Sequence, residues 1–280
     1  MGIKLNTNVH SLRAQRSLRE ATQSSARSID RLASGNRINT ASDDAAGLSI
    51  SEKLKASISS SKMAMRNSND AISVVQVADG AMNVVSSLLI RMRELAIQSA
   101  SDTYGNQERL FINKEYQAIK KEIQRTADTT KAGGFKLLDG KKSFIHFQVG
   151  IKNDDFGNRL IYKRELVNAN LSYLGIQSKD ITTAKDARSS LRALDQAIGK
   201  VSLGRTEIGA VITHLRKAIN NLHVSEEGLT AANSRIRDAD FADETANNVK
   251  SKLLTTMSTD VLAQANNLGS SILGYLDKSR

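Results

Sequence analysis

Few residues in this chain have types and spacing suited to chemistry, and the nearest match to a catalytic motif spans residues 199–206. Gly199-Lys-Val-Ser-Leu-Gly-Arg-Thr206 nearly matches the phosphate-binding pattern Gly-x4-Gly-Lys-Thr, with Arg205 in place of the lysine. A phosphate loop follows a buried strand and opens a helix, so that successive backbone amides point at the phosphates. This segment lies inside a regular apolar repeat that predicts continuous helix. We therefore expect no nucleotide site.

The remaining candidates are acidic and imidazole side chains. Asp43 and Asp44 are adjacent carboxylates, but no nucleophile or basic partner accompanies them, so they are better explained as a cap that places negative charge at a helix start. The histidines lack the i,i+4 or cysteine partners of a metal site; they are His10, His146, His214 and His223. The sequence predicts no enzyme, no cofactor and no metal.

The elements that would position any site are long helices. The chain has no proline in 280 residues, whereas roughly 14 are expected at the usual frequency, and an interior proline kinks a helix. Apolar residues recur at coiled-coil spacing in two stripes. The early stripe is Ile58, Met65, Ile72, Val75, Met82, Val85, Leu89, Met92 and Ala96, and the late one is Ala187, Leu191, Leu194, Ile198, Val201, Ile208, Leu215 and Leu222.

Two such stripes can bury each other only if the chain turns back on itself. We expect a mainly α fold, an elongated coiled-coil or helical-bundle rod, with a small β-hairpin region at about 135–165. In that region Phe144, Phe147 and Val149 should pair with residues 160–162 and cover one end of the bundle. Gly228 favours a break in the late helix near 225–228.

The two ends of the chain carry only thin apolar stripes. Residues 1–32 and the segment after Phe241 are amphipathic but rich in Asn, Ser and Thr. Burial of so few apolar residues cannot offset an ordering cost of about 1–2 kcal/mol per residue. We expect both ends to be disordered in the monomer and to fold as a coiled coil in an assembly.

Composition narrows the class of protein further. Aromatic residues make up 4% of the chain and cysteine is absent, which suits thin interhelical seams. The absence of cysteine fits either an ordinary cytosolic protein or one that crosses into an oxidising compartment. A net charge of +11 admits a basic coiled-coil protein that binds nucleic acid, but the cations are scattered among acids. We find no secretory signal and expect no membrane insertion.

Several motifs together resemble one family, the bacterial flagellins. Ser34-Gly-Asn-Arg-Ile-Asn-Thr-Ala-Ser-Asp-Asp-Ala-Ala-Gly-Leu48 is similar to the amino-terminal signature. Ser234-Arg-Ile-Arg-Asp-Ala-Asp-Phe241 and Val261-Leu-Ala-Gln-Ala-Asn266 are similar to the carboxy-terminal one. The resemblance covers nearly the whole chain and implies a short flagellin that lacks the variable outer domains. Asn267-Leu-Gly269 departs from the proline usual at that place.

The resemblance implies an inner terminal coiled-coil domain of residues 1–42 with 237–280, and a rod-like helical domain of 43–236. It implies an extracellular homopolymer, the motility filament, exported without a cleaved signal peptide by the flagellar secretion apparatus with an export chaperone. Filament cap and hook-filament junction proteins are further implied partners. Assembly is assigned to apolar residues of the two ends, namely Leu5, Val9, Leu12, Leu253, Val261, Leu268 and Ile272.

Two further expectations come with the family. Motif positions that form the epitope of an animal Toll-like receptor fall on Arg91, Leu95 and Glu115. On a helix, Arg91, Leu95 and Gln98 share a stripe that should face outward in the monomer and make lateral contacts in the filament. The alternative within the same apparatus is the hook-filament junction protein, which shares the terminal coiled coil.

Overall fold

The structure, a computed structural model, describes residues 8–140 and 144–278, with the backbone alone at 155–156 and 268–278. The chain is mainly helical, as predicted. It forms two compact units, one from its two ends, up to Ala56 and from Gly228, and one from Ser57–Glu227. The division falls inside two long helices, whereas the breaks in helical structure lie near residues 35–44 and 238–240.

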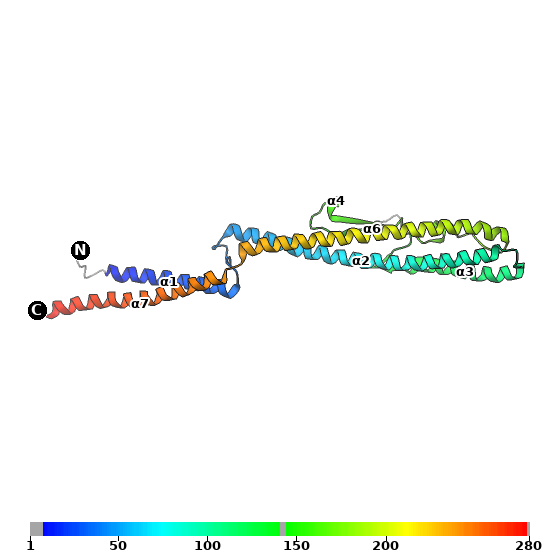
Figure 1. The fold of residues 1–280 in the computed structure, drawn as a ribbon. Helices are drawn as coiled ribbons and strands as arrows, with labels where there is room; N and C mark the ends of the chain where they lie inside the picture. The colour runs from blue at the N-terminus through cyan, green and yellow to red at the C-terminus, as the bar shows by residue number, and fades with distance from the viewer. Residues whose placement is uncertain (1–7, 141–143, 279–280) are drawn as a thin grey trace. The chain divides into compact units, whose positions relative to one another are not determined.

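The Ser57–Glu227 unit is built on α2 (Ala45–Ala100) and α6 (Ala184–Arg237), which run antiparallel through it (Figure 1). Two ion pairs show which of their residues lie side by side: Arg93 with Asp195 at 2.7 Å and Arg205 with Asp79 at 3.0 Å. The third helix, α3 (Asn106–Thr129), turns back along α2 after a short loop. The chain therefore reverses as the two apolar stripes require.

The predicted stripes form the core of this unit. Val75, Met82 and Leu89 of α2 are fully buried, as are Ala187 and Leu194 of α6. The segment 199–206 is helical throughout, so its backbone amides serve the helix. The predicted break near residues 225–228 is wrong: α6 is continuous through Gly228, because one glycine costs a helix only about 1 kcal/mol.

The length and hydropathy of α2 bear on the expectation that the chain does not insert into a membrane. By length and composition it contains a stretch apolar enough to span a bilayer, with a mean hydropathy of 1.4. The apolar face of that helix packs against protein, since Met82 and Val85 are fully buried. Asp79 lies on the same helix and pairs with Arg205. A core helix of a folded bundle can be as long and as apolar as a membrane-spanning helix.

The middle of the chain forms two small hairpins. β1 (Lys131–Ala132) pairs with β2 (Phe135–Lys136) around a Gly-Gly turn, and both glycines, Gly133 and Gly134, have positive φ. β3 (Phe144–Gln148) pairs with β4 (Arg159–Lys163), with Phe147 opposite Leu160. Short helices α4 (Asp155–Asn158) and α5 (Leu171–Leu174) follow β3 and β4 respectively.

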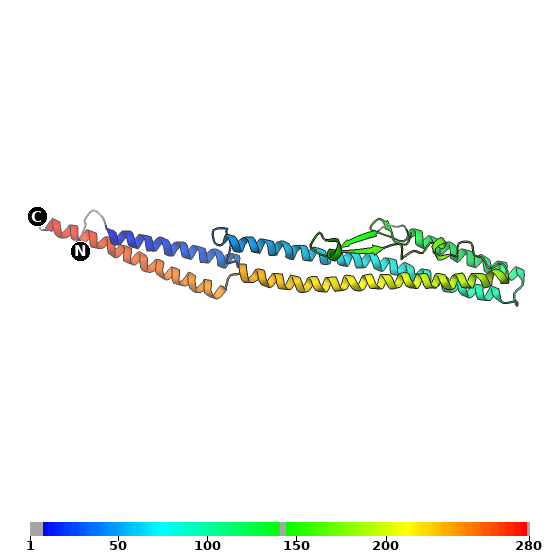
Figure 2. The same cartoon turned by 90° about the horizontal axis from the view of Figure 1, so that it is seen from above.

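The orientation of the second hairpin corrects the sequence prediction. Val149 is buried and Phe147 packs against the core, but Phe144 lies on the opposite face and is 56% exposed. Residues 144 and 147 are an odd number apart, and successive strand residues point to opposite faces. The hairpin also lies along the side of the helices, beside Asn67 of α2, rather than over their end (Figures 1 and 2).

The unit formed by the chain ends is built on α1 (Val9–Ser34) and α7 (Phe241–Lys278), an antiparallel pair visible in Figure 2. Asn8 caps α1 by accepting a hydrogen bond from the amide of Ser11, and Gly35 ends it in the left-handed conformation. Asp240 caps α7 through the amide of Ala242 at 2.8 Å. Local signals therefore begin and end α1 and begin α7.

Candidate assembly surface

The contact between α1 and α7 is made mainly by small side chains. One residue of each turn faces the partner helix, and these residues recur every three or four positions, as in a coiled coil. The buried members are Ser11, Ala14, Ala21 and Ser28 on α1, and Glu244, Ser251 and Ala265 on α7. Small residues let two helices approach closely but bury little apolar area.

Polar side chains fix the register of this pair. Asn8 donates its side-chain amide to the carbonyl of Ala265 at 2.8 Å, and Ser25 lies 3.0 Å from the amide oxygen of Asn248. Near the other end, Arg31 pairs with the buried carboxylate of Glu244 at 2.9 Å. Hydrogen bonds hold the two helices in one alignment, because such groups tolerate little displacement.

The segments that connect the terminal helices to α2 and α6 are joined to each other. Asn36 and Asp238 form an isolated antiparallel bridge, and the amide of Arg37 donates to the carbonyl of Arg237 at 2.6 Å. Ile38 is buried, and a Cβ added to Gly47 would lie 2.8 Å from its Cδ1 atom. The amino-terminal signature is thus explained by the fold of this connection.

Of the two adjacent aspartates, Asp44 caps a helix as predicted, whereas Asp43 binds amides of the loop before that helix. Asp44 accepts from the amide of Gly47 at 2.9 Å at the start of α2. Asp43 accepts from the amides of Asn39 and Thr40, and these hydrogen bonds, from Thr40 above all, hold the pKa of the Asp43 carboxyl below its usual value. Both carboxylates are committed to the backbone.

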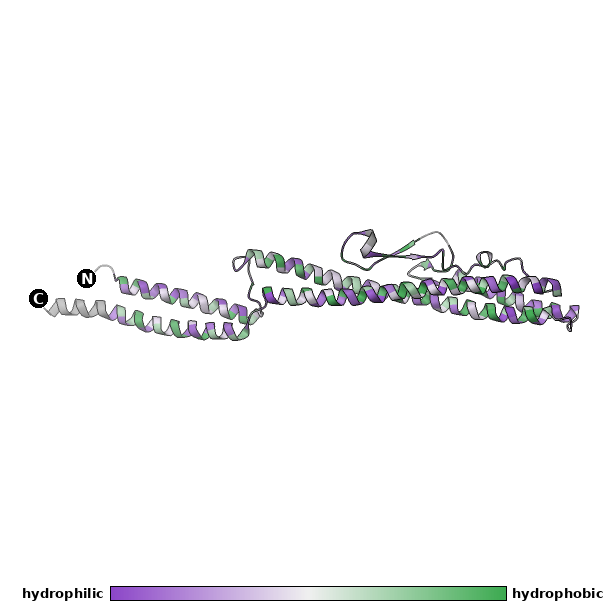
Figure 3. Cartoon of the chain, turned by 45° about the horizontal axis from the view of Figure 1, so that its top comes forward, coloured by the Kyte–Doolittle hydropathy of each residue, from purple (hydrophilic) through white to green (hydrophobic). Residues whose placement is uncertain are grey.

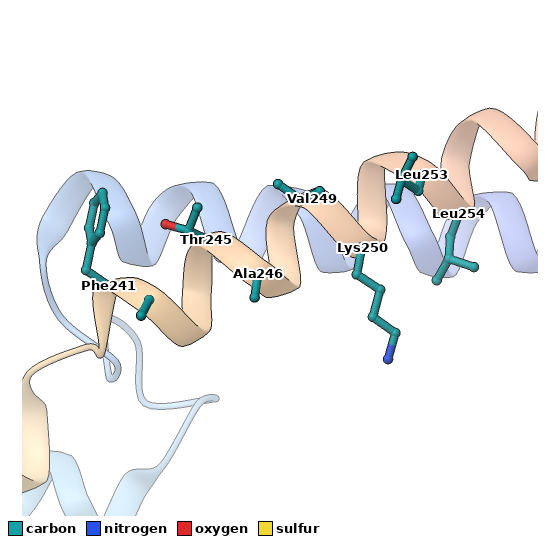
Figure 4. A pocket seen from close by; sticks show the side chains of 8 residues that line it. Phe241, Thr245, Ala246, Val249, Lys250, Leu253 and Leu254 are labelled. Carbon is teal, nitrogen blue, oxygen red and sulfur yellow. The ribbon is translucent and has the colours of Figure 1, made fainter.

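Large apolar side chains of the terminal helices point away from the contact between them. Leu12 on α1 is 54% exposed, and Leu253 and Met257 on α7 are 61% and 64% exposed. Figure 3 shows hydrophobic and hydrophilic residues interleaved along both helices. An open pocket of about 770 Å³ lies along α7 (Figure 4), lined by Phe241, Ala242, Thr245, Ala246, Val249, Lys250, Leu253 and Leu254.

The structure places the predicted assembly residues as follows. Val9, Leu12, Leu253 and Val261 are all exposed on the terminal pair. By the register of the hydrogen bonds, Leu12 and Val261 lie at the same level. Leu5 lies outside the described residues; Leu268 and Ile272 lie within α7, but their side chains are outside the description.

Sequence reasoning missed part of this surface. Phe241 and Leu254 are also exposed, and the small residues of the seam were not recognised. The seven-residue spacing of Ala14, Ala21 and Ser28 is the signal that could have identified the seam.

The second group of predicted residues is only partly exposed. Arg91 on α2 contacts Glu115 on α3 at 2.8 Å, and the side chains are 51% and 49% exposed. Leu95 is 2% exposed, so the expectation that it faces outward is wrong. α3 packs along α2 here, and this second neighbour widens the buried face of α2 beyond the single stripe that α6 covers.

Among the residues that the structure describes, no group of three or more His, Cys, Asp and Glu side chains could hold a metal ion. The fold and the terminal pair define a helical coiled-coil protein whose two ends come together and leave large apolar side chains in contact with solvent.

Comparison with known proteins identifies the family. Residues 5–143 match the bacterial flagellin N-terminal helical region, and residues 191–276 match the C-terminal helical region. A flagellin of Halalkalibacterium halodurans is 38% identical over 274 residues, covering 97% of this chain and 99% of the relative. The chain belongs to the bacterial flagellin family.

Other relatives and solved structures agree. Flagellin A of Vibrio anguillarum is 32% identical over an alignment of 378 positions, covering 99% of this chain and 100% of the relative. The alignment is longer than this 280-residue chain, so the Vibrio protein carries residues absent here. The crystal structure of Bacillus cereus flagellin matches with a TM-score of 0.50 and 28% identity, covering 56% of this chain and 88% of that one.

A putative flagellar hook-associated protein from Vibrio parahaemolyticus matches with a TM-score of 0.57 at 14% identity, covering 70% of this chain and 100% of that one. At that identity the match shows a shared fold alone, whereas the flagellin relatives match at 32–38%. The function is therefore that of a structural subunit of the bacterial flagellar filament, which lies outside the cell.

Proposed function

We propose that filament assembly uses the exposed apolar side chains of the α1–α7 pair as contacts between copies. The observation that supports this is that the pair buries mainly small residues and exposes large apolar ones. Its internal seam is made mainly of alanine and serine, while Leu12, Leu253 and Val261 face solvent. Each large apolar side chain left in water forgoes about 1.5–3 kcal/mol of burial. Neighbouring copies that cover these residues recover that free energy.

The same observation supports disorder of both ends in the free monomer. Burial of alanine and serine does not offset an ordering cost of about 1–2 kcal/mol per residue over two helices. The pair then folds as it is incorporated, which couples folding to polymerisation. Contacts between unlike surfaces that do not close into a ring generate an open helix of subunits.

Export follows from the same reasoning. A chain with unfolded ends is suited to passage through a narrow secretion channel, and an export chaperone that covers the apolar residues of α7 would prevent premature association. We assign export to the flagellar secretion apparatus without a cleaved signal peptide, and growth to an end that carries the filament cap, with junction proteins at the base. The protein acts in motility as a structural element, without enzyme activity and without membrane insertion.

Detection by an animal Toll-like receptor is a separate proposal, in which Arg91 and Glu115 are the accessible members of the predicted epitope. Their carboxylate–guanidinium contact is exposed on α2 and α3 and could exchange one partner for another. Leu95 is buried in the core, where it packs beneath the exposed residues of the epitope and does not contact the receptor itself. Lateral contacts in the filament use the same face, so the assembled protein should be nearly silent in a reporter-cell assay.

The assembly proposal is tested by placing charges on the exposed face of α7. The double variant Leu253→Asp/Val261→Asp should remain monomeric under seeding conditions in which the parent chain forms long filaments, because a buried unpaired carboxylate is strongly unfavourable. Electron microscopy and sedimentation measure the polymer. Thermal unfolding followed by circular dichroism should show the Ser57–Glu227 unit unchanged.

The matched control is Leu253→Met/Val261→Ile, which changes the same positions but keeps their apolar character and should polymerise normally. Filaments of normal length from the aspartate variant would contradict the assignment of this face to contacts between subunits.

A further inference from the structure

The two hairpins carry a concentration of positive charge that the assembly of the filament does not explain. Residues 131–163 contain seven lysines and arginines against three aspartates. In β1 and β2 the exposed Lys131 lies directly opposite Lys136. Like charges in direct cross-strand opposition destabilise a hairpin, so this arrangement has a cost to the fold.

The two hairpins are fixed beside each other. Arg164, which follows β4, donates from its guanidinium to the carbonyl oxygen of Lys136 at 2.7 Å, and it also contacts the carboxylate of Asp139 at 3.4 Å. Both Arg164 and its partner Asp139 are largely buried. The buried contact holds the end of β4, with the exposed Lys163, against the end of β2.

Nearby acidic side chains neutralise only part of this positive charge. Asp128 pairs with Lys136 at 3.2 Å, and Glu165 is an exposed acid two residues after Lys163. Within the part of the chain that the structure describes, neither Lys131 nor Lys163 forms an ion pair. Positive charge therefore remains available to an external anion.

A phenylalanine ring accompanies the lysines. Phe144 lies opposite Lys163 on the exposed face of the second hairpin and is 56% exposed. Phe135 lies on the other face of its own hairpin, because it is next to Lys136 in β2 and successive strand residues alternate in direction. An exposed aromatic ring next to cations is more typical of a binding surface than of a solvated one. We call Lys131, Lys136, Phe144 and Lys163 the hairpin patch.

We propose that the hairpin patch binds acidic polysaccharide, with the lysines contacting carboxylate or sulfate groups and the ring of Phe144 packing on the apolar face of a sugar. This rests on the extracellular position of the filament, where such polymers are the abundant polyanions. A second copy of this chain is a poor occupant, because the whole chain carries a net charge of +11 and offers few acidic surfaces to a basic patch.

Binding of the full-length monomer to immobilised dextran sulfate, alginate and neutral dextran tests the proposal independently of polymerisation. We expect binding to one or both acidic polymers, which separates sulfate from carboxylate recognition, and none to dextran. Lys131→Gln/Lys163→Gln should weaken it by about fivefold or more and reduce its dependence on salt. Lys131→Arg/Lys163→Arg should retain binding, and Phe144→Ala should weaken it.

The matched control removes the same charge elsewhere: Lys185→Gln/Lys217→Gln alters two exposed lysines of α6 and should change binding by less than about twofold. An equal loss in both double variants would show that net charge alone attracts the polymer and would overturn the proposal. It would also be overturned if duplex DNA of equal charge bound more tightly, or if alginate and dextran sulfate bound no better than dextran.

Discussion

Glycines determine how closely α6 can approach its neighbours. Gly199, Gly204 and Gly209 recur every five residues along this helix, and their surroundings differ. A Cβ at Gly204 would lie 2.8 Å from the methyl carbon of Met82 and 3.1 Å from the carbonyl oxygen of Leu166. At Gly199 and Gly209 the corresponding space is open. Only Gly204 is required by packing.

This difference predicts opposite effects of substitution. Gly204→Val should lower the free energy of unfolding by about 1–3 kcal/mol, because the backbone of Leu166 must move. Gly199→Ala and Gly209→Ala should each raise it by about 0.5–1 kcal/mol, because alanine loses less backbone entropy in a helix. Urea unfolding of the three variants measures this. Equal effects at all three positions would contradict the close approach at Gly204.

The element that most distinguishes this molecule is the α1–α7 pair, in which alanine and serine occupy positions that leucine takes in most coiled coils. The narrow seam allows close approach and leaves alignment to polar contacts such as Asn8 with Ala265 and Arg31 with Glu244. A helix pair built this way needs further apolar contacts from outside.

Enlarging one seam residue should therefore damage assembly. Ala21→Leu should raise the critical concentration for polymerisation several-fold, because the larger side chain forces the helices apart and overpacking costs about 1–3 kcal/mol. Ala21→Ser is the control and should be tolerated, since serine already occupies equivalent places at Ser11 and Ser28. Sedimentation of filaments at graded protein concentrations gives both values. Normal assembly of the leucine variant would argue against this seam.

At the scale of the whole molecule, the two compact units differ in how they are stabilised. The Ser57–Glu227 unit buries large residues such as Met82, Tyr116 and Ile123, whereas the terminal unit buries mainly small ones. Burial of large apolar side chains is the main favourable term in folding. We expect the first unit to be stable in the monomer and the second to depend on assembly.

Limited proteolysis tests this difference. Brief trypsin treatment of the monomer should cleave first at Arg13, Arg16, Lys250 and Lys252 and leave a stable fragment close to residues 57–227, because proteases cut locally unfolded segments. The same sites should be protected in the filament. Mass spectrometry of the fragments identifies the cleavage points. Resistance of these sites in dilute monomer would show that the terminal pair folds without neighbours.

The sequence by itself determined the helices, their main core and the family. Without proline, and with apolar residues at regular spacing, the stripes through Val75 and Leu194 could form only long amphipathic helices, and the Asp44 cap and the Gly133-Gly134 turn are local signals. The sequence also proposed Val9, Leu12, Leu253 and Val261 as assembly residues; the structure leaves their side chains exposed, and their role in assembly stays a prediction. These features depend on interactions between near neighbours in the chain.

Only the tertiary structure decided which faces are covered. Leu95 is buried because α3 returns along α2, and Phe144 is exposed because the register of β3 and β4 turns it away from the core. The close approach at Gly204 and the small-residue seam between α1 and α7 likewise depend on segments distant in sequence. The apolar repeat of a helix shows which face is buried first, but it does not show how many other segments pack against that helix. The number of packed neighbours decides whether a residue beside the apolar stripe contacts protein or water.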